Sequence, residues 1–313
     1  MASSETEKLP HKAVVDFSNT EIAFAHKSDS ELKRSAWLFN MMNKPWLVST
    51  GSAIGLWLNE TGINIFNPII KATIFKQFCG GTSLMQCKDA IEHLQENKTL
   101  TILDYGAEGK TKEEDFEHTL QENINAIRFG SSHGGVPVIS TKVTALAAND
   151  LLEKYQSGIK LTSEENSAFI RIRNRLDHLC RTAMDHGVAV FIDAEETWMQ
   201  ETIDELVKAM MEKYNKHKVV VYHTYQLYRK DKLADLKADH QEAKSKGYIL
   251  GAKFVRGAYM EKERAKAIEK GYPSPIHDTK ENTDKDFNEA VRYCVEHYRE
   301  IASCNGSHNL KSN

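Results

Sequence analysis

Residues 250–264 read Leu-Gly-Ala-Lys-Phe-Val-Arg-Gly-Ala-Tyr-Met-Glu-Lys-Glu-Arg, an apolar run that gives way to a charged one. The apolar and partly β-branched residues 248–255 predict a buried strand, and residues 259–267 predict a helix. Lys253 and Arg256 place two cations within or directly after the strand, where charges are rarely buried without a partner. We therefore expect an anion to meet them, unless both side chains reach solvent from a strand end.

Gly257 and Ala258 stand between this strand and this helix. Because neither carries a bulky side chain, a flat ligand can approach the backbone there. The free N–H groups and the dipole of the following helix favour negative charge. The junction therefore predicts a binding site for a phosphorylated cofactor.

The composition narrows the class of protein. The chain has 313 residues, of which 41% are hydrophobic, and a formal net charge of -3. It is long enough for one large core, and it is neither basic enough for nucleic acid binding nor acidic enough to suggest disorder. Its five cysteines are odd in number and widely spaced, which argues against a disulfide framework and against a metal site. The first residues lack an apolar signal core, so we expect a cytoplasmic protein.

Residues 71–313 alternate short apolar runs with longer amphipathic stretches, as in repeated β/α units around a parallel sheet. This pattern predicts an α/β barrel, preceded by a helical arm over residues 1–70. Seven candidate strands are residues 76–79, 99–105, 136–141, 188–193, 219–225, 248–255 and 301–305. Helical spacing of apolar residues marks residues 111–129, 163–186, 200–214, 230–246 and 283–300.

Polar residues follow most of these strands. They are Asp104 to Glu108, Ser140 to Lys142, Asp193 to Glu196, His223 to Gln226, Lys253 with Arg256, and Ser307 to Asn309. In a β/α barrel the catalytic groups collect at the carboxyl ends of the strands. Each group taken singly is also compatible with a solvated strand end, but their convergence on one mouth predicts an active site.

Two other functions are compatible with such a barrel. Lys142 or Lys253 could serve as the Schiff-base amine of a lyase or aldolase, which would need no flavin. A catalytically inactive barrel could instead serve as a binding or assembly subunit.

Four motifs resemble those of proline dehydrogenases. They are Gly-Ala-Lys-Phe-Val-Arg-Gly-Ala-Tyr at 251–259, Ile-Asp-Ala-Glu-Glu-Thr at 192–197, Thr-Tyr-Gln-Leu-Tyr at 224–228 and Ser-His-Asn at 307–309. The resemblance covers about residues 70–309. It implies a distorted (β/α)8 TIM-type barrel that holds FAD noncovalently and oxidises L-proline to Δ1-pyrroline-5-carboxylate, the first step of proline catabolism. It also implies a membrane quinone as electron acceptor.

The resemblance implies cofactor contacts for ten residues. Lys253 matches a position near N5 and O4 of the flavin, where a cation stabilises the reduced anion. Arg256 would lie near the phosphate or ribitol end, and Gln226 at the edge of the isoalloxazine ring. The other matches are Val255, Gly257 and Ala258 for backbone contacts, Thr279 and Thr283 for the adenosine portion, and His308 and Asn309. For the two threonines a helix N-cap is the alternative.

The substrate residues that the resemblance implies are Lys142, Asp193 and Tyr259. Lys142 would bind the substrate carboxylate, and the ring of Tyr259 would pack against proline. Asp193 would fix Lys142, because a buried lysine and a buried aspartate usually pair to limit their desolvation cost. No residue is clearly the base that takes the amine proton, and none is needed if proline reacts as the neutral amine.

The resemblance further predicts an eighth strand and a last helix whose paired arginines bind the proline carboxylate. Neither has a counterpart before Asn313, so we expect the barrel to lack its last β/α unit in this chain. Either the sequence is part of a longer chain, or it is a truncation that binds flavin poorly and turns over little. Pyrroline-5-carboxylate dehydrogenase is an expected partner, and a peripheral contact with the inner membrane is expected through the quinone site.

Overall fold

The computed structural model describes residues 19–51, 71–106 and 109–312. Two compact units divide the chain, Met1–Cys87 and Lys88–Asn313. The sequence-based boundary after residue 70 lies N-terminal to this division. We describe each unit by itself.

The described part of the first unit is helical, as predicted for the N-terminal arm. It contains α1 (Thr20–Ala23), α2 (Asp29–Met42), a π-helical turn (Lys71–Phe75) and α5 (Lys76–Phe78). A capping box begins α2, since Ser28 accepts from the backbone of Glu31 and the Glu31 side chain accepts from the backbone of Ser28.

The strand predicted at residues 76–79 is wrong, because these residues form α5 and its C-cap. The backbone N–H of Cys79 donates to the carbonyl of Phe75 at 2.8 Å, so the hydrogen bonds close within the chain rather than across a sheet. Residues 76–79 are Lys-Gln-Phe-Cys, and a run of four residues is too short to distinguish a helix from a strand.

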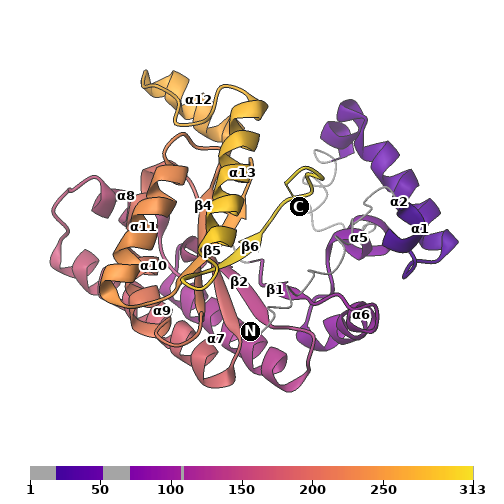
Figure 1. Ribbon diagram of the computed structural model, residues 1–313, viewed down its shortest axis with the longest axis horizontal. Helices are drawn as coiled ribbons and strands as arrows, with labels where there is room; N and C mark the ends of the chain where they lie inside the picture. Colours follow the sequence, from indigo (N-terminus) through magenta and orange to yellow (C-terminus); the bar gives the residue numbers. More distant parts are fainter. Residues whose placement is uncertain (1–18, 52–70, 107–108, 313) are drawn as a thin grey trace, which may run out of the picture. The chain divides into compact units, whose positions relative to one another are not determined.

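The second unit is built on one parallel sheet of six strands in sequential order (Figure 1). The strands are β1 (Ile102–Asp104), β2 (Val138–Lys142), β3 (Ala189–Asp193), β4 (Val221–Gln226), β5 (Leu250–Val255) and β6 (Ile301–Asn305). All six were predicted within a few residues. Sequential parallel strands joined by helices are the arrangement of a β/α barrel.

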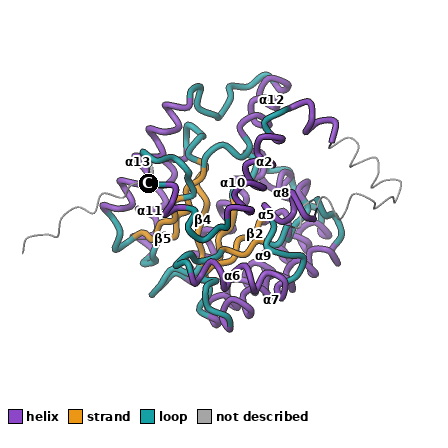
Figure 2. Tube along the Cα trace, turned by 90° about the vertical axis from the view of Figure 1, so that its right-hand side faces the viewer, coloured by secondary structure: helices purple, strands orange, loops and turns teal. Residues whose placement is uncertain are grey.

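Helices connect the strands. They are α6 (Leu84–Glu96), α7 (Glu113–Ser132), α8 (Asn149–Gln156), α9 (Ser163–His186), α10 (Thr197–Tyr214), α11 (Lys232–Lys246), α12 (Met260–Lys270) and α13 (Lys280–Glu296). Of these, α7, α9, α10, α11 and α13 pack against the sheet (Figures 1 and 2). The sequence analysis did not identify α6 or α8. The ends of α9 follow its sequence: a capping box of Thr162 and Glu165 begins it, and Gly187 ends it with φ at 71°.

The strand register assigns each side chain to one of two faces. Ser140, Phe191 and Tyr222 occupy neighbouring positions on β2, β3 and β4, and Lys142 stands beside Asp193. The residues that alternate with these along each strand face the helices, and among them Ile139 and Val190 are fully buried. The main core therefore lies between the sheet and the helices, and the carboxyl ends of the strands carry the polar residues.

Candidate active site

The predicted site residues gather where the strands end. Lys142 and Asp193 are register neighbours at the ends of β2 and β3, and Gln226 and Val255 are register neighbours at the ends of β4 and β5. Lys253 lies two residues before the end of β5, on the same face as Val255. The structure thus brings these five side chains to one mouth.

An ion pair joins two of these residues across the mouth. Nζ of Lys253 donates to Oδ1 of Asp193 at 2.5 Å, and it also lies 5.2 Å from the centre of the Phe191 ring. Both side chains are mostly buried, at 16% and 23% exposure. The sequence analysis paired Asp193 with Lys142, whereas the structure shows Asp193 bound to Lys253. The anion that Lys253 was predicted to meet is therefore present within the chain.

Lys142 and Tyr259 form a second contact of the mouth. Burial raises the pKa of the Tyr259 phenol, and a hydrogen bond with Lys142 acts in the opposite direction. The backbone N–H of Tyr259 donates to the hydroxyl of Tyr228 at 3.4 Å. The ammonium of Lys142 on β2 and the ring of Tyr259 before α12 thus lie in contact, while their roles in binding the substrate stay a prediction.

Gln226 is buried, and its amide is already bonded within the protein. Its Nε2 donates to the backbone oxygen of Glu195 at 2.7 Å and to the Tyr228 hydroxyl at 3.0 Å. Nη1 of Arg229 donates to its Oε1 at 3.4 Å. Gln226 therefore links the ends of β3 and β4, and its predicted contact with a flavin edge stays a prediction.

Glu195 belongs to the mouth, although the sequence analysis did not select it as a site residue. Only 3% of it is exposed, and its carboxylate accepts hydrogen bonds from the backbone N–H of Thr144 at 3.1 Å and from the Thr144 hydroxyl. Burial raises the pKa of Glu195 to about 7, although Thr144 and the charge of Lys142 act against the rise. The only signal in the sequence was its place in the Asp-Ala-Glu-Glu segment after a strand.

Arg256 lies between the end of β5 and α13. Its guanidinium bonds Asp284 through Nη1 and donates to the Ser312 hydroxyl through Nη2 at 2.5 Å, and it stacks 3.9 Å from the centre of the Phe287 ring. Within the described residues its Nε is buried without a hydrogen bond partner. Burial lowers the pKa of this guanidinium.

The backbone after Arg256 has the shape that the sequence predicted. Gly257 has φ at 82°, in the left-handed region that favours glycine, and a Cβ added there would lie 3.2 Å from the sulfur of Met260. Ala258 follows, and then α12 begins at Met260 with two acidic residues in its first turn. A small-residue bend thus leads directly into a helix N-terminus.

The two threonines of α13 have structural roles. Thr279 is the N-cap of α13, and its hydroxyl accepts from the backbone N–H of Asn282 at 3.2 Å. The hydroxyl of Thr283 is buried and donates to the carbonyl of Thr279 at 3.5 Å. The N-cap alternative is thus confirmed for Thr279, while contacts with adenosine stay a prediction.

His308 and Asn309 follow β6. His308 is exposed, and Asn309 is half-buried. The turn is held by hydrogen bonds from Asn309 N to Ser307 Oγ at 3.1 Å and from Lys311 N to Asn309 Oδ1 at 2.9 Å. Because Ser312 bonds Arg256, this turn lies beside the end of β5.

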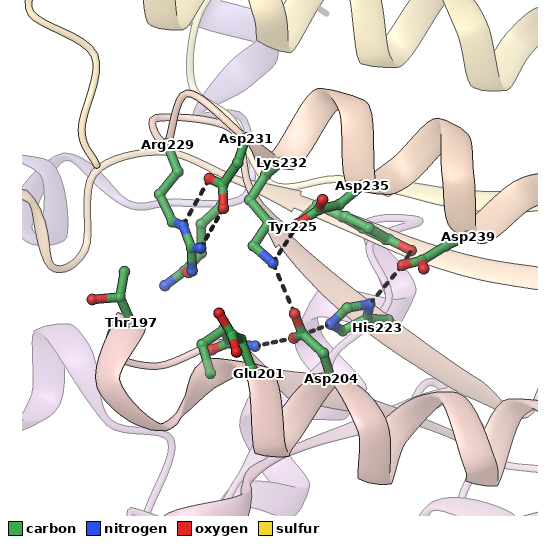
Figure 3. A network of polar contacts seen from close by, with 12 residues as sticks. Thr197, Glu201, Asp204, His223, Tyr225, Arg229, Asp231, Lys232, Asp235 and Asp239 are labelled. Carbon is green, nitrogen blue, oxygen red and sulfur yellow. Dashed lines mark hydrogen bonds and ion pairs between the residues drawn. The ribbon is translucent and has the colours of Figure 1, made fainter. Parts of the chain in front are cut away.

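A polar network lies behind the mouth, between β4, α10 and α11 (Figure 3). Oδ1 of Asp204 lies 2.8 Å from Nε2 of His223 and accepts from Nε2 of Gln200 at 2.5 Å, while Oδ2 accepts from Nζ of Lys232 at 2.8 Å. Although burial alone would raise the pKa of Asp204, His223 and Lys232 hold it well below its usual range. Oε1 of Gln200 accepts from the backbone N–H of Glu195 at 2.5 Å, so the network supports the loop that carries Glu195.

His223 and Tyr225 do not belong to the mouth, contrary to the prediction that the whole segment from His223 to Gln226 faces it. His223 is bound to Asp204, and the hydroxyl of Tyr225 donates to Asp239 on α11 at 2.9 Å. The reason is the alternation of side chains along β4, which turns these two toward the helices and leaves Thr224 and Gln226 on the other face.

Two features are absent from the residues that the structure describes. Its described ranges contain no cluster of three or more His, Cys, Asp or Glu side chains arranged to hold a metal ion. Among the same residues, we find no helix with the length and hydrophobicity that a membrane crossing needs.

Comparisons with known proteins agree with this geometry. A family model for proline dehydrogenase matches residues 87–313. The carbapenem antibiotics biosynthesis protein CarD of Pectobacterium carotovorum subsp. carotovorum is 31% identical over 235 residues, which cover 75% of this chain and 61% of that protein. The mitochondrial proline dehydrogenase 1 of Homo sapiens is 37% identical over 153 residues, which cover 48% of this chain and 26% of that protein.

The fold has solved counterparts. Proline utilization A from Bdellovibrio bacteriovorus superposes with a TM-score of 0.66 at 19% identity, over 94% of this chain and 31% of that one. This similarity establishes the fold as that of a TIM-like barrel. The chain spans less than two thirds of the length of each of these relatives. Because the family model matches most of its length, the chain belongs to the proline dehydrogenase family.

Proposed function

We propose that this chain carries the flavin-dependent oxidation of L-proline to Δ1-pyrroline-5-carboxylate. The observation that carries the proposal is the convergence of Lys142 and the Lys253–Asp193 ion pair on one mouth of a barrel that belongs to this family. Cations on two facing strands suit a reaction that joins an anionic amino acid to an anionic cofactor.

The residues present fit FAD. Arg256 has a buried, unpartnered Nε at the end of β5, where a phosphate or ribitol oxygen could accept from it. The bend at Gly257 presents bare backbone before the N-terminus of α12, and both favour the approach of a flat, anionic group. Bound there, FAD would supply the acceptor for the hydride of proline.

The chain's own groups would orient the substrate. The ammonium of Lys142 would bind the proline carboxylate, and the Tyr259 ring would pack against the pyrrolidine ring. Lys253, fixed by Asp193, would place its charge beside the flavin. Proline would react as the neutral amine, so no protein base is assigned.

The electron acceptor and the partners are part of the same proposal. Electrons would pass to a membrane quinone, with the protein in peripheral contact with the membrane, and pyrroline-5-carboxylate dehydrogenase would take the product. If added lipid left activity with a soluble quinone unchanged, the membrane contact would be wrong.

An anaerobic visible spectrum of the purified protein before and after L-proline tests the proposal. We expect flavin bands that bleach with L-proline and not with D-proline. Flavin bands that never bleach would contradict proline oxidation by this chain while keeping the cofactor. Colourless protein that traps a carbonyl compound with borohydride would favour the Schiff-base lyase, and colourless, unreactive protein would favour the inactive barrel.

Two variants test whether the bleaching of the flavin bands depends on Lys253. Lys253→Met removes the cation that would face the flavin and should slow bleaching. Lys230→Met is the matched control, because Lys230 forms an exposed ion pair with Asp278 at 3.2 Å and should leave bleaching unchanged.

A further inference from the structure

Glu195 contacts residues that follow or end two neighbouring strands. Its carboxylate accepts from the backbone and the hydroxyl of Thr144, its backbone N–H donates to Gln200, and its backbone oxygen accepts from Gln226. These contacts join the turn after β2 to the start of α10 and the end of β4. Glu195 is therefore fixed in place at the barrel mouth.

Thr144 lies in the 3-10 turn Val143–Ala145, which begins directly after Lys142. A carboxylate that holds both the N–H and the hydroxyl of Thr144 fixes the direction in which β2 ends. The same turn sets where the Lys142 ammonium lies relative to Tyr259. Glu195 thus acts on Lys142 through two bonds to the neighbouring turn, in addition to its charge.

We propose that Glu195 is a positioning residue of the proposed proline oxidation, whose ionised carboxylate holds the Thr144 turn and so places Lys142 to bind the substrate carboxylate. The inference rests on the proposed function for its substrate. When Glu195 is protonated, one oxygen becomes a donor and stops accepting from Thr144, so the hold on the turn weakens.

The groups that face Glu195 set the pH at which this change occurs. Burial raises its pKa to about 7, the Lys142 charge on β2 lowers it, and Glu196 raises it. Tyr259 faces it from the start of α12, and Glu195 raises the pKa of that phenol in turn. From α10 the facing side chain is the neutral Gln200.

The kinetic test is the pH profile of L-proline oxidation. For the wild type we expect KM to fall about tenfold as pH rises through 7, with kcat changing less, because the loss is one hydrogen-bonded contact with a charged group. Glu195→Gln keeps the shape but carries an amide that cannot ionise, so it should lack this tenfold component and show only the pH dependence that deprotonation of the proline amine gives to both proteins. A profile of Glu195→Gln that follows the wild type would overturn the proposal.

Two neighbouring substitutions should move the same transition in opposite directions. Glu196→Gln removes a negative charge that raises the pKa of Glu195, so the transition should shift to lower pH. Thr144→Val removes a hydrogen bond that lowers this pKa, so the transition should shift to higher pH. A purely structural role would change stability in these variants and would leave the transition in place.

An experiment without substrate separates this inference from the proposed function. The carboxyl carbon of Glu195 is followed by 13C NMR against pH, with Glu195→Gln for assignment. We expect titration near neutral pH that moves upward in Lys142→Met, because the Lys142 charge lowers this pKa. If the protein fails to oxidise proline but the titration of Glu195 moves upward in Lys142→Met, the proposed function is wrong and the coupling of Glu195 to Lys142 is supported. A titration that Lys142→Met leaves unchanged overturns the inference whatever the substrate.

Discussion

Glu195 and Asp204 are two mostly buried carboxyl groups of one barrel, and their environments move their pKa values in opposite directions. Burial raises the pKa of Glu195 to about 7, whereas His223 and Lys232 hold that of Asp204 well below its usual range. The difference lies in the donors, since Asp204 is bound by His223, Lys232 and Gln200, whereas Glu195 accepts from the neutral Thr144.

This contrast separates a structural carboxylate from a functional one. Asp204 stays charged and joins β4, α10 and α11 behind the mouth (Figure 3). Glu195 can gain or lose a proton near neutral pH beside Lys142, and perturbed carboxyl groups of this kind cluster at functional sites. Substitutions behind the mouth should therefore lower stability, and substitutions at the mouth should lower activity.

The largest effect is expected from Asp204→Asn. It would leave Lys232, a residue that is 3% exposed, without its buried carboxylate, and we expect a loss of about 3 kcal/mol in the free energy of unfolding. Denaturant unfolding measures it. The control is Asp235→Asn, since Asp235 binds the same lysine from a side chain that is 43% exposed and should cost less than about 1 kcal/mol. Equal losses in the two variants would remove the distinction between the sites.

Lys142→Met should show the reverse pattern. Under the proposed function, losing the cation that would bind the substrate carboxylate should lower kcat/KM for L-proline about a hundredfold, because such contacts are worth about 2 to 5 kcal/mol. Unfolding free energy should stay within about 1 kcal/mol of the wild type. Steady-state kinetics and denaturant unfolding give both values, with Lys230→Met as the exposed control. A loss of stability in Lys142→Met as large as that in Asp204→Asn would indicate that Lys142 at the mouth has a structural role.

The fold could be predicted from the sequence wherever an element was long enough to show the spacing of its apolar residues. Alternating apolar runs and amphipathic stretches placed all six strands and the helices α7 and α9 to α13. They failed at residues 76–79, where Lys-Gln-Phe-Cys is too short to show a period and forms α5 with its C-cap. Helices α6 and α8 were also missed, although the apolar residues of both lie on one face.

The site followed from the sequence only in part. The rule that polar groups collect at strand ends placed Lys142, Asp193 and Lys253 correctly at the mouth. The ion pair of Asp193 with Lys253 joins residues 60 positions apart, and the choice of partner depends on where the side chains meet in three dimensions. The orientation of His223 could have been predicted, because side chains alternate along β4 and His223 therefore points away from the face that carries Gln226.

The stability of the protein should depend on pH differently through Glu195 than through Asp204. A carboxyl group with a raised pKa stabilises the folded state fully below its unfolded pKa of 4.5, and this contribution is lost as pH rises through about 7. The stability of the wild type relative to Glu195→Gln should therefore fall by about 3 kcal/mol from pH 4.5 to pH 8. For Asp204 the contribution is present above its unfolded pKa and is lost only in acid, so the cost of Asp204→Asn should stay constant over this range. Unfolding at several pH values checks both, and a cost of Asp204→Asn that changes as much as that of Glu195→Gln would contradict the contrast.

The smallest effect tests whether Thr279 is structural or touches the cofactor. Its hydroxyl already caps α13 through Asn282, so Thr279→Ala should cost about 1 kcal/mol of unfolding free energy, and Thr279→Ser should restore it. FAD affinity, followed by flavin fluorescence, should stay within about twofold of the wild type in both variants, since a capping bond faces the helix. If Thr279→Ala instead weakened FAD binding about tenfold without loss of stability, the residue would belong to the adenosine site, because only a contact made in the bound state can change affinity alone.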